Sequence, residues 1–360
     1  MRCGIVGLPN VGKSTLFNCL SNAKALAANY PFATIEPNVG IIPVPDKRLE
    51  QLSKMINPKN VQAAIVEILD IAGLVKGASK GEGLGNKFLA NIRETNAIIH
   101  VLRCFEDANV THVDGMVDPV KDKETVDIEL QLKDLETLEK KKDSLKRLVN
   151  TGDKKALREL EIIDGYYNHI RSGNSARSLH LDGDDCILNL NLLTNKPVLY
   201  VCNVDENSIN GNKYTDMLKT AIEQEKGKLL IISAAIEAEI NELESVLDRQ
   251  EFLKEIGLEE PGVNKIINSA YSLLGLHTFF TAGEKEVRAW TIKKGALAPQ
   301  AAGVIHTDFE KGFIRAEVIA FDDRMQFKTE QACREAGKIS IEGKNYEVRD
   351  GDVIHFRFNV

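Results

Sequence analysis

Residues 7–15, with the sequence GLPNVGKST, carry the side chains best suited to chemistry in this 360-residue chain. They match the G-x-x-x-x-G-K-[ST] phosphate loop, in which glycines let backbone N–H groups surround phosphate oxygens at the start of a helix. Lys13 would contact the β- and γ-phosphates, and the hydroxyl of Ser14 would bind Mg²⁺. The apolar run Cys3–Val6 precedes the loop and helical spacing follows it, so the sequence predicts a nucleoside triphosphate site.

A second element of the phosphate site, Asp70–Gly73, follows an apolar run that is typical of a buried strand. It has the D-x-x-G pattern of regulatory NTPases, in which Asp70 would hold Mg²⁺ through water and the Gly73 N–H would reach the γ-phosphate. Between the two elements, Thr34 is expected to close on Mg²⁺ when triphosphate is bound. The alternative is an ordinary loop threonine.

Two further positions bear on hydrolysis. Leu74 stands where Ras-type enzymes carry the glutamine that orients the attacking water, so another residue or a partner would have to position that water. Asn10, two residues before Gly12, stands where potassium-dependent phosphate-loop enzymes use an asparagine as an ion ligand. A K⁺ ion there would replace the charge of an arginine finger. The alternative role for Asn10 is to cap the loop by bonding its own backbone.

The element that selects the base departs from the guanine-specific N-K-x-D pattern, because residues 203–206 read NVDE. Val204 replaces the lysine, and Glu206 replaces the aspartate that accepts hydrogen bonds from guanine. Specificity that depends on polar pairing is sensitive to such a displacement. The Asn203 amide can still donate to and accept from a purine edge. The sequence therefore favours ATP over GTP, with a GTP-binding switch as the alternative.

These motifs and several longer strings resemble the YchF/Obg-like ATPase family, a branch of the translation-factor-related GTPases. The matching strings are NYPFATIEPN at residues 29–38, DIAGLVKGA at 70–78, GLGNKFL at 83–89, RCFE at 103–106 and DGDVIHFRF at 350–358. The resemblance runs nearly from end to end, and it implies a nucleotide domain, an inserted coiled coil and a C-terminal TGS domain with a β-grasp fold. It also implies potassium-stimulated ATP hydrolysis and association with ribosomes or ribosomal RNA.

The same resemblance implies that a loop histidine replaces the missing glutamine, and the matching residue is His112. A neutral imidazole can orient water at physiological pH; the alternative is a surface loop histidine. Lys13 and His112 are therefore the expected catalytic residues. The expected metal ligands are Ser14, Thr34 and Asp70. The expected nucleotide-binding residues are Asn10, Val11, Gly12, Lys13, Ser14, Thr15, Gly73, Asn203, Val204, Glu206, and Ser233 and Ala234 of the loop that backs the base.

The elements that must position these residues read as alternating strands and helices. Strands are predicted at residues 39–42, 64–69, 97–102, 198–202 and 229–232. Intervening helical patterns predict an α/β fold with a doubly wound, mainly parallel sheet over residues 1–275. Within it, near-heptad spacing predicts an antiparallel helical hairpin at residues 121–190, with a solvated, charged surface. Its seam would contain Ile128, Leu135, Leu138, Leu145 and Leu148.

The periodicity changes to short strands separated by turns after residue 276, which predicts a small α+β domain over residues 276–360. Its strands are expected at residues 279–282, 287–292, 314–320, 339–341, 346–348 and 353–358. Helices are expected at about residues 299–309 and 329–336.

The composition is that of an ordinary globular protein large enough for more than one domain. The net charge of −7 gives no whole-molecule attraction to nucleic acid. The sequence has no apolar run of membrane-spanning length, and its six scattered cysteines form no disulfide or zinc pattern, so a cytoplasmic protein is expected. Beside the ATPase and the GTP switch, a third alternative is an RNA- or ribosome-binding module in which nucleotide only stabilises the fold.

Overall fold

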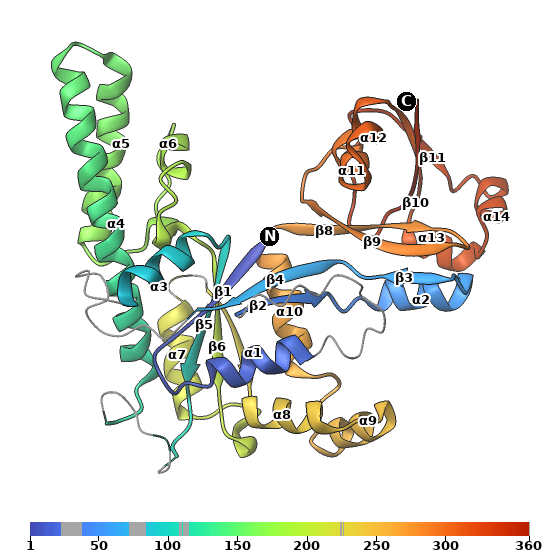
Figure 1. Cartoon of the computed structure of the whole chain (residues 1–360), viewed down its shortest axis with the longest axis horizontal. Coiled ribbons are helices and arrows are strands. Elements are labelled where there is room, and N and C mark those ends of the chain that lie inside the picture. Colours follow the sequence, from blue (N-terminus) through green and yellow to red (C-terminus); the bar gives the residue numbers. More distant parts are fainter. Residues whose placement is uncertain are drawn as a thin grey trace. The chain divides into compact units, whose positions relative to one another are not determined.

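The computed structural model describes residues 1–22, 38–71, 84–107, 110, 115–223, 225 and 227–359 (Figure 1). The chain divides into two compact units. The first comprises Met1–Ile41 and Glu67–Ile266, and the second comprises Ile42–Val66 and Ile267–Val360. The domain ranges expected from the sequence, 1–275, 121–190 and 276–360, stay predictions.

The first unit contains a six-stranded sheet with the order β2-β4-β1-β5-β6-β7. Its strands are β1 (Arg2–Val6), β2 (Val39–Pro43), β4 (Ile65–Asp70), β5 (Ala97–Arg103), β6 (Val198–Asn203) and β7 (Lys228–Ile232). β1 pairs in parallel with β4 and β5, and β5, β6 and β7 continue the parallel arrangement. Every residue of β5 is buried, as expected for a strand covered on both faces. The predicted doubly wound, mainly parallel sheet is confirmed.

The helices of this part of the chain lie between the strands of the sheet in sequence or follow its last strand (Figure 1). They are α1 (Lys13–Asn22), α3 (Leu84–Arg93), α7 (Lys213–Glu223), α8 (Ala234–Glu242), α9 (Val246–Glu255) and α10 (Gly262–Leu273). α1 packs against α8. Leu218 and Ile222 of α7 share an apolar cluster with Tyr200 and Cys202 of β6. The parallel strands therefore end at a common edge, where their loops meet.

The predicted helical hairpin is present as α4 (Pro119–Asn150) and α5 (Lys154–Arg171). Both helices begin at an aspartate that accepts hydrogen bonds from the first turn: Asp118 accepts from the N–H groups of Val120 and Lys121, and Asp153 caps α5 in the same way. The chain then returns through α6 (Asp185–Leu188) and 3₁₀ turns at Ala176–Ser178 and Leu193–Asn195.

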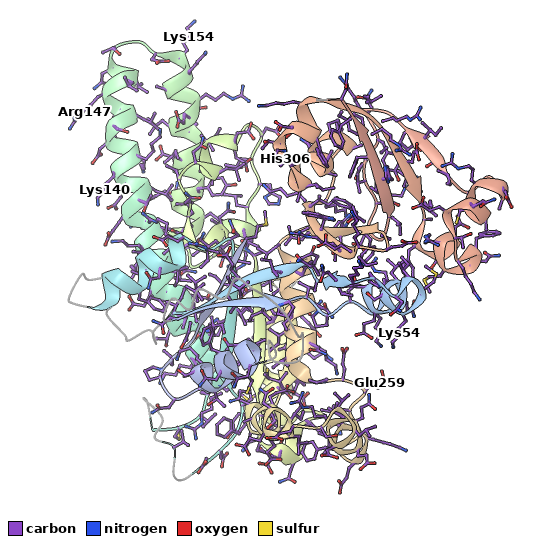
Figure 2. The ribbon with its side chains drawn as sticks, turned by 45° about the vertical axis from the view of Figure 1, so that its right-hand side comes forward. Lys54, Lys140, Arg147, Lys154, Glu259 and His306 are labelled. Atoms are coloured by element: carbon purple, nitrogen blue, oxygen red, sulfur yellow. The ribbon has the colours of Figure 1, made fainter. Side chains whose placement is uncertain are left out.

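The seam of the hairpin differs in part from the heptad prediction. Leu138 and Leu145 are buried, but Ile128 is 52% exposed and Leu148 is 49% exposed. Val149, four residues after Leu145, joins the apolar cluster, because helical spacing places i+4 on the same face. Other faces of the hairpin carry charge, and Figure 2 shows Lys140, Arg147 and Lys154 along it.

The second unit has a sheet with the order β11-β10-β12-β8-β9-β3. Its strands are β3 (Asn60–Gln62), β8 (Leu276–Ala282), β9 (Glu286–Lys293), β10 (Phe313–Ile319), β11 (Ser340–Glu342) and β12 (Val353–Phe358). Its helices are α2 (Lys47–Ile56), α11 (Ala298–Ile305), α12 (Thr307–Lys311), α13 (Phe321–Phe327) and α14 (Glu330–Glu335). α11 supplies Ala298, Ala301 and Ala302 to the apolar core beneath the sheet.

Two secondary-structure predictions in this unit are wrong. Tyr346–Val348 forms no strand, because it takes part only in an isolated antiparallel bridge between Leu297 and Glu347. The Ala298 N–H donates to the Tyr346 carbonyl and the Val348 N–H donates to the Ala296 carbonyl, while the Tyr346 N–H donates to Gly343 within its own turn. The single helix expected at 299–309 is two helices, since His306 has extended dihedral angles and serves as the N-cap of α12.

Candidate nucleotide-binding site

The phosphate loop connects β1 to α1 and has the backbone that its glycines permit. Gly7 has φ of +154° and Gly12 has φ of +95°. A methyl group on Gly7 would lie 2.4 Å from the carbonyl oxygen of Val101, and one on Gly12 would lie 2.3 Å from Nδ2 of Asn203. Both positions therefore require glycine on grounds of conformation and of space.

Lys13, the first residue of α1, places its ammonium group back over the loop. Its Nζ donates to the carbonyl of Leu8 at 2.5 Å, and the residue is only 7% exposed. Burial lowers the pKa of Lys13 to about 8, although the negative charge of Asp70 opposes that shift. A charged ammonium held in this position lacks a full counter-charge, and a bound phosphate would supply one.

Ser14 and Asp70 meet beside Lys13. Parallel pairing of β1 with β4 sets Asp70 opposite Ile5, and the Ser14 hydroxyl donates to Oδ2 of Asp70 at 3.5 Å. Burial raises the pKa of Asp70, while Lys13 and the hydrogen bond from Ser14 act in the opposite direction. A hydroxyl and a carboxylate are the oxygen donors that a hard divalent cation prefers.

This pair fits a divalent metal that is bound together with a nucleotide. Among the described residues, no group of three or more His, Cys, Asp or Glu side chains is placed to hold an ion. A metal at Ser14 and Asp70 would complete its coordination with phosphate oxygens and water.

Asn203 ties the phosphate loop to the element expected to back the base. Its Nδ2 donates to the carbonyl of Val11 at 3.0 Å, and its Oδ1 accepts from the N–H of Ala234 at 2.9 Å. The residue is 5% exposed. Ser233, just before Ala234, is the N-cap of α8 and accepts from the N–H of Ile236. Asn203 thus holds three loops of the site together in addition to any contact with a base.

The remaining predicted residues surround these contacts. Val11 and Val204 are buried, and the Val204 N–H donates to the carbonyl of Ile232. Glu206 is exposed. Asp205 caps the 3₁₀ turn Glu206–Ser208 by accepting from the N–H of Asn207.

Two other phosphate-loop residues are exposed to solvent. Asn10 is exposed and has φ of +60°, and Thr15 is exposed in the first turn of α1. Thr34, Gly73, Leu74 and His112 lie outside the described residues, so their expected roles stay predictions.

Arg103 is a residue whose role the sequence analysis missed. It ends β5, is 2% exposed, and donates to the carbonyls of Phe105, Asp107 and Val110. Its guanidinium also lies 4.7 Å from the centre of the Phe105 ring. The backbone that leads toward position 112 is therefore anchored by one buried cation. An arginine at the end of a strand that is otherwise apolar except for His100 was the available signal.

A family model described as 50S ribosome-binding GTPase matches residues 2–150, and the YchF-GTPase_C model, described as a protein of unknown function (DUF933), matches residues 276–359. In the described part of the chain, no helix combines the length and apolar character needed to cross a bilayer.

Several relatives match over the whole chain. The protein named Ribosome-binding ATPase YchF from Haemophilus ducreyi is 55% identical, covering 100% of this chain and 99% of that protein. Its namesake from Bacillus subtilis is 51% identical, with 100% of both chains covered. The solved structure of the Schizosaccharomyces pombe YchF GTPase aligns with a TM-score of 0.91 at 40% identity, over 99% of this chain and 97% of that one.

Proposed function

Because this chain belongs to the YchF family, we propose that it is a ribosome-associated P-loop ATPase whose bound nucleotide controls its docking. The observation that carries this proposal is the convergence of Lys13, Ser14 and Asp70 at the ends of β1 and β4. Phosphoryl transfer requires a cation that binds the phosphates, which Lys13 would supply, and a hydroxyl and a carboxylate that hold the metal, which Ser14 and Asp70 would supply.

Lys13 would act by exchanging partners. In the structure its ammonium donates to the Leu8 carbonyl, and a β- or γ-phosphate oxygen would offer a stronger, charge-assisted bond. Ser14 and Asp70 would hold the divalent metal, which we take to be Mg²⁺, and the metal would neutralise phosphate charge. The N–H groups at the start of α1 would contact the phosphates directly.

The preference for ATP over GTP is part of the proposal, and Val204 and Glu206 support it. Guanine recognition needs a carboxylate at a set distance from the base, while the exposed Glu206 has a longer side chain than aspartate. Val204 is buried and its N–H is already bonded to Ile232, so it supplies an apolar surface rather than a donor. The double change Val204→Lys with Glu206→Asp should shift the preference toward GTP.

Hydrolysis would depend on two further groups. Asn10 is exposed on the phosphate loop, where its side-chain carbonyl can be a ligand of K⁺ beside the phosphates. His112 would orient the attacking water in place of the glutamine that Leu74 replaces. The buried anchor at Arg103 supports this assignment, because it fixes the start of the segment that carries His112.

Membership of the YchF family also supports an assignment of the remaining domains. We assign residues 121–190 to a helical insertion and residues 276–360 to a TGS-type domain, and the family match at 276–359 supports the second assignment. Association with ribosomes would place the protein in the cytoplasm.

Cosedimentation with purified 70S ribosomes tests this function. The chain should sediment to a different extent with a non-hydrolysable ATP analogue than with ADP, and Lys13→Ala should remove that difference. The exposed variant Lys228→Ala is the matched control and should behave as the parent. Equal sedimentation in both nucleotide states, with ATP binding verified by titration, would contradict nucleotide-controlled docking.

A further inference from the structure

The sheet of the second unit contains a gap between two neighbouring strands. β8 and β12 run in parallel, yet their only Cα pairing joins Val353 to Phe280, where the Phe280 N–H donates to the Asp352 carbonyl at 2.8 Å. β8 continues to Ala282 and β12 to Phe358, and across these described residues no further pairing follows. The opposite edge of β12, by contrast, pairs with β10 along its whole length.

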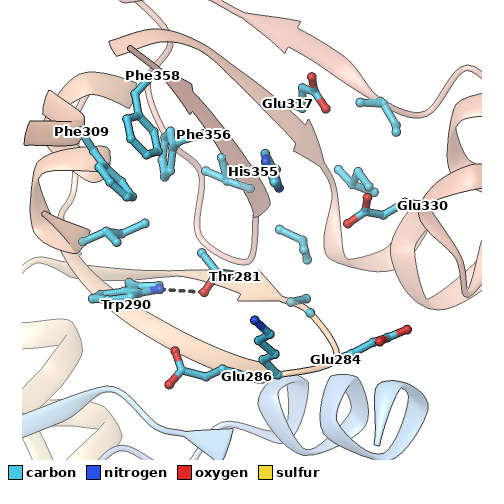
Figure 3. A pocket seen from close by; sticks show the side chains of 18 residues that line it. Thr281, Glu284, Glu286, Trp290, Phe309, Glu317, Glu330, His355, Phe356 and Phe358 are labelled. Atoms are coloured by element: carbon cyan, nitrogen blue, oxygen red, sulfur yellow. Dashed lines mark hydrogen bonds between the residues drawn. The ribbon is translucent and has the colours of Figure 1, made fainter. Parts of the chain in front are cut away.

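A cavity of about 620 Å³ occupies this gap, and Figure 3 shows its lining. One wall is aromatic and consists of Trp290, Phe309, Phe356 and Phe358. Its rings are held in place, because Trp290 Nε1 donates to Thr281 Oγ1 at 2.9 Å and Phe309 stacks on Phe358 with 3.6 Å between ring centres. The volume lies within the range of about 300–1,000 Å³ that is typical of ligand sites.

The other wall is acidic. The lining includes Glu284, Glu286, Glu317 and Glu330, against the single lysine Lys285. Glu317 forms ion pairs with three arginines, Arg357 at 3.1 Å, Arg315 at 3.5 Å and Arg334 at 3.7 Å. The other three carboxylates make no ion pair within the part of the chain that the structure describes. Figure 3 shows Glu284 and Glu330 on the side of the cavity away from Phe309 and Phe358.

We propose that this gap binds an extended peptide segment of a partner protein, in which apolar side chains stand beside lysine or arginine. The unpaired edge of β12 would bond the peptide backbone, as in other cases where a strand is added to a sheet. The aromatic wall would take the apolar side chains, and the carboxylates would pair with the basic ones. RNA fits less well, because its phosphates would face the three unpaired carboxylates. The proposal does not depend on nucleotide hydrolysis.

Fluorescence anisotropy of the full chain with labelled octapeptides tests this site. The probe is an octapeptide of alternating lysine and valine, compared with its glutamate–valine counterpart and with a lysine–valine peptide N-methylated at alternate residues. The lysine–valine peptide should bind with a Kd at least tenfold below those of both others. Equal binding of the two charge forms, or full binding of the N-methylated peptide, would overturn the proposal.

Reversing the charge of two cavity residues provides a second test of the peptide site. The double variant Glu284→Lys with Glu330→Lys should weaken binding of the lysine–valine peptide at least tenfold. The control, Glu335→Lys with Glu347→Lys, makes the same change at exposed positions of the same unit outside the cavity, and it should leave the Kd within twofold. Thermal unfolding verifies that both variants are folded. Equal weakening in both variants, or displacement of the peptide by a twelve-nucleotide oligouridine, would contradict a peptide site.

Discussion

Asn203 and Val11 are 192 positions apart in the sequence, yet the amide of Asn203 donates to the carbonyl of Val11 at 3.0 Å. The same side chain accepts from Ala234, so one buried amide holds the phosphate loop against the loop before α8. The position of the phosphate loop therefore depends on a residue of the segment 203–206, which we propose selects the base.

The variant Asn203→Ala should destabilise the fold and weaken ATP binding together. It leaves the Val11 carbonyl and the Ala234 N–H without their partner, and each unsatisfied buried group costs about 1–3 kcal/mol. Chemical denaturation and ATP titration measure the two effects. Asn207→Ala, the same change at an exposed position nearby, should alter neither. A stable Asn203→Ala protein with parental ATP affinity would show that the bridge is dispensable.

ATP affinity should fall as the pH rises above 8. The pKa of Lys13 is lowered to about 8, so the ammonium that binds phosphate is present below that pH and is lost above it. Bound phosphate would raise the pKa of Lys13 again, so ATP binds to the protonated lysine. Above a pKa of about 8 the Kd therefore rises about tenfold per pH unit, and we expect a rise of about tenfold between pH 7 and pH 9. Calorimetric titration across this range measures the effect.

Lys13→Arg is the control for that titration, because its guanidinium stays charged over the same range. Its Kd should vary much less between pH 7 and pH 9. If the parent and Lys13→Arg show the same pH profile, another group is responsible.

His112→Ala should lower kcat by about a hundredfold and leave the Kd for ATP nearly unchanged, because water orientation acts mainly in the transition state. Leu74→Ala should cause no comparable loss, since leucine has no polar group to remove. Arg103→Lys should also lower kcat, because it removes donors to three carbonyls of the segment before His112. Single-turnover hydrolysis separates kcat from binding, and parental turnover in His112→Ala would exclude a catalytic role.

The phosphate loop could be predicted from the sequence, whereas the hydrogen bond between Asn203 and Val11 could not. The prediction of the loop rests on local spacing, because that spacing fixes φ angles and hydrogen bonds within a few residues. The bridge from Asn203 to Val11 depends on the order of strands in the sheet, and no local pattern encodes it.

The attachment of residues 42–66 to the second unit has a similar explanation. β3 is only three residues long and pairs with β9 through backbone groups, so no side-chain alternation marks it as part of that sheet. Arg103 likewise reads as an ordinary strand end until its three carbonyl partners are seen. Long-range pairing, rather than local propensity, decides these features.

Hydrolysis should be faster in K⁺ than in Na⁺ at matched ionic strength, because the ion would balance charge that develops on the leaving group. Asn10→Ala should remove most of the K⁺ advantage while changing ATP affinity less. Steady-state rates in the two salts measure the ratio. Equal rates in K⁺ and Na⁺ for the parent protein would leave Asn10 with only a role in loop conformation.

The proposed ATPase activity is tested most directly by the rate at which the purified chain hydrolyses ATP and GTP with Mg²⁺ and K⁺ present. We expect slow hydrolysis with a higher kcat/KM for ATP, a fall in kcat of about a hundredfold or more in Lys13→Ala, and no change in Lys228→Ala. Hydrolysis of ATP by Lys13→Ala at the parental rate would contradict the assignment of this loop as the catalytic phosphate site.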